Sequence, residues 1–155
     1  MIQRIQTIFL LLAALSMGSL FINGMSFFSL EGTAVDLQNE KQSMLVDGVF
    51  DIGDHILLVG ICGVIILLSI IAIFQFSNRK RQVKITRISL VLNIVLLILI
   101  TILFLQDFNK LVSREYVMNG EYGLLSPVLS IIFVLLAIRF IKKDDKLVKS
   151  MDRLR

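Results

Sequence analysis

Residues 88–105, ISLVLNIVLLILITILFL, decide the fold class of this chain. Only Ser89, Asn93 and Thr101 interrupt a run of Ile, Leu, Val and Phe. A helix that crosses a hydrocarbon layer of about 30 Å needs about 20 mostly apolar residues. At about −0.4 kcal/mol for each apolar residue, insertion of this segment into a membrane is favourable. The stretch therefore predicts a transmembrane helix over 85–105.

The rest of the chain has the same apolar character. Of its 155 residues 56% are hydrophobic, and the mean hydropathy is +0.85, which exceeds what a soluble core needs. The apolar residues form long blocks between charged segments, and the blocks besides 85–105 are 5–28, 55–76 and 122–141. We therefore expect an all-α membrane protein, a four-transmembrane-helix bundle that forms a single membrane domain over 1–155.

The fourth block contains the only proline of the chain, Pro127. Ser126-Pro127 is typical of an N-cap followed by a proline at the first helical position, where the missing N–H has no helical acceptor to lose. We therefore expect this proline to begin the last helix rather than to break it.

The distribution of Lys and Arg predicts the orientation, because these residues are retained on the cytoplasmic side of a membrane. One precedes the first span, five lie between the second and third spans, and seven lie at or beyond the end of the fourth, so thirteen of the sixteen share one side. The thirteen are Arg4, Arg79, Lys80, Arg81, Lys84, Arg87, Arg139, Lys142, Lys143, Lys146, Lys149, Arg153 and Arg155. The two other loops carry nine of the twelve acidic residues. A multi-pass protein with cytoplasmic N- and C-termini is expected.

The extracytoplasmic loop over 29–54 alternates apolar and polar residues in places. Alternation within 33–37 and 44–50, with turns at 38–42 and 47–48, predicts a pair of strands. In the second outside loop, residues 116–118 precede Asn119-Gly120, a type I′ turn signal that predicts a further strand. The sequence therefore indicates a small β-hairpin or sheet in the extracytoplasmic loops, with two irregular loops as the alternative.

The segment 142–155, KKDDKLVKSMDRLR, follows the fourth span without a glycine or proline, so we expect the helix to continue into it. Its apolar residues recur at helical spacing, and they are Leu147, Val148, Met151 and Leu154. An amphipathic cytoplasmic tail of this kind contacts anionic headgroups or a partner protein. The alternative is that it is only the solvated end of the last helix.

Small and amide residues within the spans are candidates for helix packing. Ala14 and Gly18 lie four residues apart on the first span, and Gly60 and Gly63 share a face of the second. Such residues let helices approach closely, within one chain or in a complex. Asn93 is a further candidate, because an amide in lipid favours a hydrogen-bond partner on another helix.

The sequence offers little that points to chemistry. No Asp, Glu, Lys or Arg lies centrally in any span, which disfavours a transporter or pump that acts alone. A group of possible divalent-cation ligands lies outside the membrane, and its members are Asp47, Asp51, Asp54 and His55. Their spacing matches no metal-binding loop, and a solvated acidic loop explains them more simply. We expect no enzyme activity, no catalytic residue, no cofactor, no metal and no nucleic-acid partner.

The two ends of the chain carry a family resemblance. MIQRIQTIFLLLA at residues 1–13 and RFIKKDDKLVKSMDRLR at residues 139–155 resemble an uncharacterised, domain-of-unknown-function family of short four-span bacterial inner-membrane proteins. The resemblance spans the chain and is strongest at those ends. It implies the bacterial cytoplasmic (inner) membrane and the same four-span plan, but it implies no activity.

These features favour a structural or accessory integral membrane protein, a component of an envelope complex. Its partners would be the lipid bilayer and other membrane proteins or a second copy of itself. One alternative is a small transporter or lipid-handling protein with a path near Asn93 and Thr101. A second alternative is an outward-facing, metal-assisted hydrolase built on the loop carboxylates.

Overall fold

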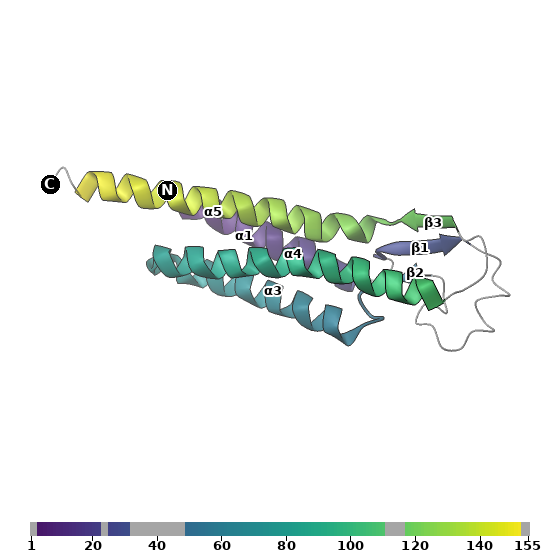
Figure 1. Cartoon of the computed structure of the whole chain (residues 1–155). Coiled ribbons are helices and arrows are strands. Elements are labelled where there is room, and N and C mark those ends of the chain that lie inside the picture. Colours follow the sequence, from purple (N-terminus) through teal and green to yellow (C-terminus); the bar gives the residue numbers. More distant parts are fainter. Residues whose placement is uncertain (1–2, 23–24, 32–48, 111–116, 153–155) are drawn as a thin grey trace.

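The computed structural model describes residues 3–22, 25–31, 49–110 and 117–152 (Figure 1). Most of this part of the chain is helical, and the four α-helices are α1 (Gln3–Gly18), α3 (Ile56–Phe74), α4 (Arg79–Lys110) and α5 (Leu125–Asp152). Short 3-10 helices extend three of them, namely η1 (Ser19–Phe21) after α1, η2 (Gln75–Ser77) after α3 and η3 (Tyr122–Leu124) before α5. Three strands complete the order: β1 (Phe28–Glu31), β2 (Val49–Phe50) and β3 (Val117–Gly120).

The helices lie side by side, and each runs antiparallel to the next along the chain (Figure 1). α1 packs against α3 and α5, and α4 packs against the same two helices, so the four form a closed ring around one interior. The buried residues of a helix recur at spacings of three and four, which is the pattern of a left-handed bundle. On α3 they are Leu58, Cys62, Ile65, Ser69 and Ala72.

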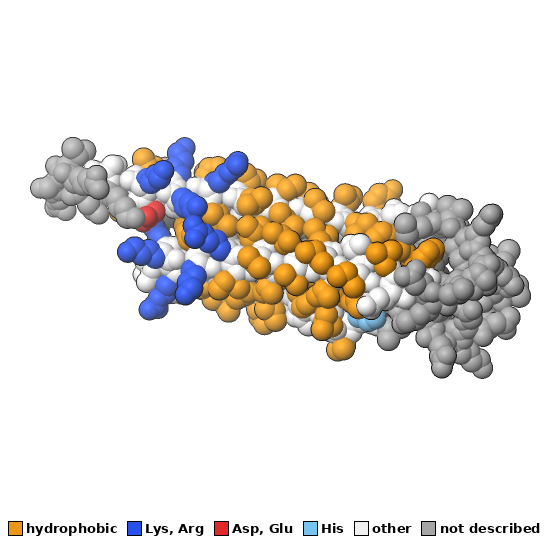
Figure 2. Space-filling model, viewed as in Figure 1, with side chains coloured by type: hydrophobic (Ala, Val, Ile, Leu, Met, Phe, Trp, Pro, Cys, Tyr) orange, Lys and Arg blue, Asp and Glu red, His pale blue; other side chains and the backbone are white. Residues whose placement is uncertain are grey.

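Apolar side chains also cover the outside of the bundle. Figure 2 shows them as a wide band across the middle of the face in view. Leu15 on α1, Leu67 on α3 and Ile98 on α4 are 60%, 59% and 53% exposed. Within the described residues, three segments are long and apolar enough to cross a membrane, and they are Ile56–Ser77, Arg79–Gln106 and Tyr122–Val148. The predicted class, a helical membrane protein, is confirmed, because a soluble protein rarely exposes so large an apolar surface.

The first helix is shorter than the sequence predicted. We expected one apolar span over 5–28, but α1 ends at Gly18 and η1 at Phe21, and the backbone of Ile22 is already extended. Phe28 instead begins β1, and the backbone of Phe27 forms hydrogen bonds beside it. The amide of Phe27 donates to the carbonyl of Phe50 at 2.8 Å, and its own carbonyl accepts from the amide of Glu121 at 3.0 Å. Hydrophobicity alone cannot separate a helical run from a buried extended one, so the pattern did not reveal this boundary.

A small antiparallel sheet closes one end of the bundle, as the sequence indicated. Its strand order is β2-β1-β3, with Phe28 opposite both Phe50 and Gly120. The turns that we predicted at 38–42 and 47–48 lie outside the described residues. The predicted type I′ turn at Asn119-Gly120 is wrong, because both residues belong to β3 and pair with Ser29 and Phe28. Pairing with a distant strand outweighs the local turn preference here.

The last helix begins before the predicted cap. α5 starts at Leu125 and follows directly from η3, so Ser126 is not its N-cap. The hydroxyl of Ser126 instead lies 2.9 Å from the hydroxyl of Ser19, where it links α5 to η1. Pro127 lies within the first turn of α5, where backbone amides have no intrahelical acceptor, so the proline is tolerated without breaking the helix.

Aromatic rings attach the sheet to the helices. The ring of Phe104 on α4 stacks on that of Phe28 with centroids 4.2 Å apart, and it meets the ring of Phe50 edge-on at 5.6 Å. Phe27 packs on Phe50 at 6.1 Å, and Phe27, Phe50 and Phe104 are almost wholly buried. Such aromatic pairs contribute about 0.5–1.5 kcal/mol beyond the area that they bury. The sheet and this end of the bundle therefore share one core.

Gly123 lies where two backbone segments approach closely. The amide of Gly123 in η3 donates to the carbonyl of Ser26 at 2.8 Å. A Cβ atom at residue 123 would lie 2.3 Å from that carbonyl oxygen and 2.7 Å from its carbon. Both atoms are backbone, so neither can swing away, and only glycine fits.

We predict that Gly123→Ala lowers the free energy of unfolding by about 2–3 kcal/mol, because the backbone at Ser26 must shift to admit the methyl group. Gly60→Ala is the matched control. Nothing lies within 4 Å of a Cβ built at residue 60 in α3, so this change should stabilise the helix by about 0.5–1 kcal/mol. Thermal unfolding of the purified protein in detergent, followed by circular dichroism, measures both. Equal unfolding temperatures for Gly123→Ala and the parent would contradict the conclusion that only glycine fits at residue 123.

Candidate functional site

Polar side chains connect all four helices at the end of the bundle opposite the sheet. The amide Nε2 of Gln6 on α1 donates to the carboxylate Oδ2 of Asp144 on α5. The guanidinium of Arg79 on α4 donates to the backbone carbonyl of Asp144 at 2.9 Å. The amide Nε2 of Gln82 on α4 donates to the carbonyl of Ala72 on α3 at 3.0 Å. We call Gln6, Arg79, Gln82 and Asp144 the polar junction.

Three of the four residues of the polar junction are buried. Gln6, Gln82 and Asp144 are 6%, 3% and 5% exposed. Ala72 lies in the last turn of α3, whose carbonyls have no intrahelical donor, so the side chain of Gln82 satisfies an acceptor that the helix cannot. Removal of one member leaves its partner buried without a hydrogen bond, which costs about 1–3 kcal/mol. The junction therefore fixes how the four helix ends meet.

The sequence analysis missed this junction because it treated 142–155 as a tail outside the bundle. Asp144 in fact extends the buried stripe of α5, at the spacing set by Ala137 and Ile141. Had the stripe of the last span been continued past its apolar end, Asp144 would have been identified as an interior residue. In the same way, the buried stripe of α4 can be followed from Ser89 and Thr86 toward the beginning of the helix, where it includes Gln82.

Asn93 lies in the interior, as its chemistry suggested, but its hydrogen bond is local. Its Nδ2 donates to the carbonyl of Ser89 on the same helix at 2.8 Å. Its Oδ1 and the hydroxyls of Ser89 and Ser130 have no hydrogen-bond partner in the described part of the chain. The expected bond from Asn93 to another helix is therefore not formed there.

Asn93 and Ser130 lie at the same height in the bundle. Each is fourteen residues from the contact that joins Arg79 on α4 to Asp144 on α5. At about 1.5 Å per residue both are about 21 Å from that contact along antiparallel helices. Thr101 lies elsewhere, since it is exposed and its hydroxyl donates to the carbonyl of Leu97 at 3.0 Å. A path that joins Asn93 to Thr101 is therefore opposed by the outward position of Thr101.

The small residues proposed for packing do not mark close contacts within the chain. Nothing lies within 4 Å of a Cβ built at Gly18, Gly60 or Gly63. On α1 the residue at the core is Ala13, which is fully buried, whereas Ala14 is only partly buried. The described part of the chain therefore shows no close contact at the three glycines. The role of these residues in helix packing, within this chain or in a complex, stays a prediction.

The acidic residues at the sheet end of the bundle shape a turn. The carboxylate of Asp51 accepts from the amide of Gly53 at 2.6 Å, and that of Asp54 accepts from the amide of Asp51 at 2.7 Å. The ring of His55 lies 5.8 Å from that of Phe50. Asp47 lies outside the described residues, and the residues that are described contain no group of three His, Cys, Asp or Glu that would hold a metal. Asp51 and Asp54 therefore connect β2 to α3.

The predicted continuation of the last helix is present, because α5 extends to Asp152. Residues 145–152 follow the contacts of Asp144 with α1 and α4 and add about 12 Å of helix. We call this segment the overhang, and Figure 1 shows it extending beyond the other helices. Leu147 is 42% exposed there, and Val148 is partly buried. The side chain of Met151 and all of Leu154 lie outside the described part of the chain.

Comparison with known proteins identifies a family without a known activity. A family model described as "Domain of unknown function (DUF4293)" matches residues 2–154. No curated protein and no solved structure matches the chain. The resemblance to an uncharacterised family is thereby confirmed.

We predict that two buried amides on α4 respond differently to the same change. Gln82→Leu should lower the free energy of unfolding by about 1–2 kcal/mol, because it leaves the carbonyl of Ala72 without its donor. Asn93→Leu should change it by less than about 1 kcal/mol or raise it, since the amide makes no described bond between helices. Unfolding in detergent by heat or denaturant measures both. A greater loss for Asn93→Leu than for Gln82→Leu would contradict this ranking.

Proposed function

We propose that this chain, which belongs to the uncharacterised DUF4293 family, is a structural or accessory integral membrane protein of the bacterial inner membrane and a component of an envelope complex. In this proposal the bundle anchors the protein, and the parts that extend past the hydrocarbon layer contact other components. The observation that carries it is the overhang, a helical extension with an exposed leucine beyond the end of the bundle.

A fourth membrane crossing by α1 is part of the proposal. Its apolar portion, Ile5–Phe21, combines α-helix up to Gly18 with a 3-10 turn. At about 1.5 Å and 2.0 Å per residue this portion is about 27 Å long, close to the hydrocarbon thickness of about 30 Å. Ile8, Leu11 and Leu15 are about half exposed on its outer face, as lipid contact requires.

Charge supports an orientation with both termini in the cytoplasm. The Lys and Arg residues whose side chains are described lie at the end of the bundle away from the sheet, and Figure 2 shows a group of them there. They are Arg79, Lys80, Arg81, Lys84, Arg87, Arg139, Lys142, Lys143 and Lys146. Because basic residues are retained on the cytoplasmic side, the sheet would face the opposite compartment.

Two surfaces are available to partners under this proposal. The overhang would extend into the cytoplasm with Leu147 unshielded, and a helix face that mixes apolar and basic residues binds either headgroups or a partner helix. The sheet lies at the other end of the bundle and would be the second such surface.

A lipid-handling or transport role is the alternative, and one observation favours it. Asn93 Oδ1 and the hydroxyls of Ser89 and Ser130 are buried without a described partner, and such atoms usually bond to water or a ligand. This role needs a substrate between α4 and α5 at their height. Lipid or substrate density there in a structure determined in a bilayer mimic would favour it over the accessory role.

We predict the orientation of two cysteine variants in a Cys62→Ala background. Tyr122→Cys, at an exposed position beside the sheet, should react in intact cells with a maleimide that cannot cross the inner membrane. Ser77→Cys, exposed at the α3–α4 connection, should react only after that membrane is permeabilised. Reaction of Ser77→Cys but not of Tyr122→Cys in intact cells would overturn the orientation. Equal reaction of both variants would contradict the proposal that the helices cross the membrane.

We predict that Leu147→Glu prevents co-purification of partners from native membranes in mild detergent, because a carboxylate replaces the apolar contact of the overhang. Leu147→Met keeps an apolar side chain on the same helix and should retain the partners. Affinity purification with quantitative mass spectrometry compares the two variants with the parent. If cross-linking in native membranes yields only the monomer of the parent chain, the accessory role is wrong.

A further inference from the structure

Two adjoining grooves lie at the basic end, the larger along α4 and the smaller between α4 and α5. The larger, of about 620 Å³, is lined by cationic Lys80, Lys84 and Arg87 and by apolar residues that include Ile88 and Val91. The smaller, of about 360 Å³, is lined by Arg79, Lys142 and Lys146 together with Asp145. Lys80 and Val83 line both, so the two form one continuous groove, which we call the basic groove.

The basic groove has a strong excess of positive charge. Six of its side chains are Lys or Arg, and Asp145 is its only carboxylate. The hydrogen bond from Arg79 to α5 ends on a backbone carbonyl, which does not neutralise the guanidinium. Asp144, the neighbouring acid, is turned into the interior toward Gln6. The charge of the groove is therefore suited to an anion.

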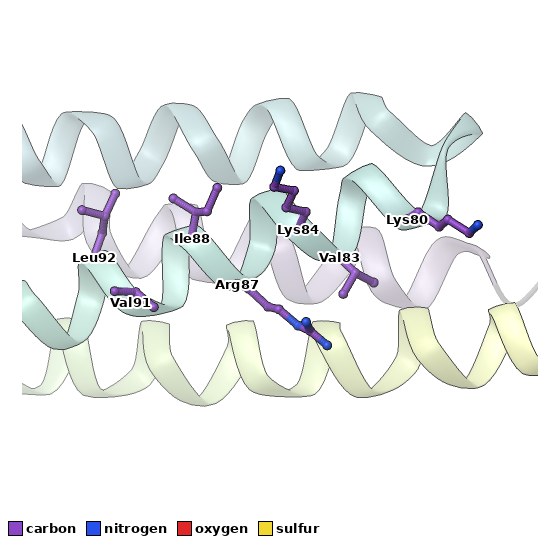
Figure 3. A pocket seen from close by; sticks show the side chains of 7 residues that line it. All are labelled: Lys80, Val83, Lys84, Arg87, Ile88, Val91 and Leu92. Carbon is purple, nitrogen blue, oxygen red and sulfur yellow. The ribbon is translucent and has the colours of Figure 1, made fainter.

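The charge is confined to one part of the groove. Along one face of α4 the lining changes from Lys80, Lys84 and Arg87 to Ile88 and Val91, as Figure 3 shows. Seven residues separate Lys84 from Val91, which is about 10 Å along a helix. In Figure 3 Lys84 and Arg87 extend to opposite sides of α4, and Ile88 and Val91 follow them along the same helix. This order matches a molecule with an anionic head and an apolar chain.

We propose that the basic groove is a binding site for an anionic glycerophospholipid of the cytoplasmic leaflet. The phosphate would lie between Lys84 and Arg87 with Lys80 close by, because a guanidinium and an ammonium form charge-assisted hydrogen bonds to phosphate oxygens. One acyl chain would lie along Ile88 and Val91. Basic pockets between helices at the cytoplasmic side of a membrane are suited to such headgroups. The proposal rests on the membrane orientation above and not on any partner protein.

General attraction to a negative surface is the competing explanation, since basic residues collect at a cytoplasmic face in any case. The chain offers a matched control for it. Arg81 on α4 and Lys143 on α5 are exposed at the same end but do not line the groove. A site in the groove depends on Lys84 and Arg87 and not on Arg81 and Lys143, whereas surface attraction depends equally on both pairs of charges.

Native mass spectrometry of the full chain released from detergent tests the proposal, with phosphatidylglycerol titrated against phosphatidylcholine. The parent should retain phosphatidylglycerol preferentially, and Lys84→Gln with Arg87→Gln should weaken this binding about tenfold or more. Arg81→Gln with Lys143→Gln should leave it within about twofold. Equal losses in the two double variants, or no preference in the parent, would overturn the site. This readout is independent of cell topology and of co-purifying partners.

Two further measurements separate a binding defect from a folding defect and a lipid from free phosphate. Lys84→Arg with Arg87→Lys keeps both charges and should retain the lipid, and the circular dichroism spectrum of each variant should match that of the parent. Inorganic phosphate in millimolar excess should not displace the lipid, because it lacks a chain to contact Ile88 and Val91. Displacement by phosphate would show that the groove binds a bare anion and would overturn the lipid site.

Discussion

The arrangement of the helices depends on the need of buried polar groups for hydrogen-bond partners where water does not reach them. In this bundle the outer faces of the helices are apolar as well as the inner ones, so hydrophobicity alone does not determine which side turns inward. The buried stripe of α4 changes from polar to apolar along its length, through Gln82, Thr86, Ser89, Asn93, Leu96, Ile100 and Phe104. Rotation of α4 would break the bond from Gln82 to the carbonyl of Ala72 on α3. This bond between helices therefore favours the observed rotation of α4.

The helices followed from hydropathy, because that signal extends over many residues. The turn signal at Asn119-Gly120 predicted a further strand at 116–118, and a strand is present over Val117–Gly120, although these two residues belong to the strand and not to a turn. What the sequence could not show depended on distant partners. The end of α1 at Gly18 is decided by Phe27, whose backbone pairs with residues 50 and 121. Residue 123 must be glycine because the backbone of Ser26 lies against it. Asp144 is an interior residue whose carboxylate accepts a hydrogen bond from Gln6. Asn93 was identified as a candidate from its chemistry. Its position in the sequence did not show that its amide bonds to a carbonyl of its own helix.

The basic end of the molecule combines several physical roles in neighbouring residues. Arg79 links α4 to α5 inside the polar junction and also lines the basic groove. Asp144 and Asp145 are adjacent in sequence, yet the first is directed into the bundle and the second lines the groove. A helix turns about 100° per residue, so two adjacent acids lie on different faces of α5. The same turn of α5 thus closes the interior, borders the groove and begins the overhang.

The strand order of the sheet also bears on how the protein is made. β1 follows the first helix, but its partner β3 lies between the last two, and the two strands pair across more than half of the chain. Because the chain is synthesised from the amino terminus, β1 cannot pair with β3 until α4 has been made and β3 has followed it. The rings of Phe28 and Phe104 can stack only once α4 has been made, and the backbone can cross Ser26 only after Gly123 follows. Completion of the sheet therefore depends on segments from both halves of the chain, because β1 pairs with β2 on one edge and with β3 on the other.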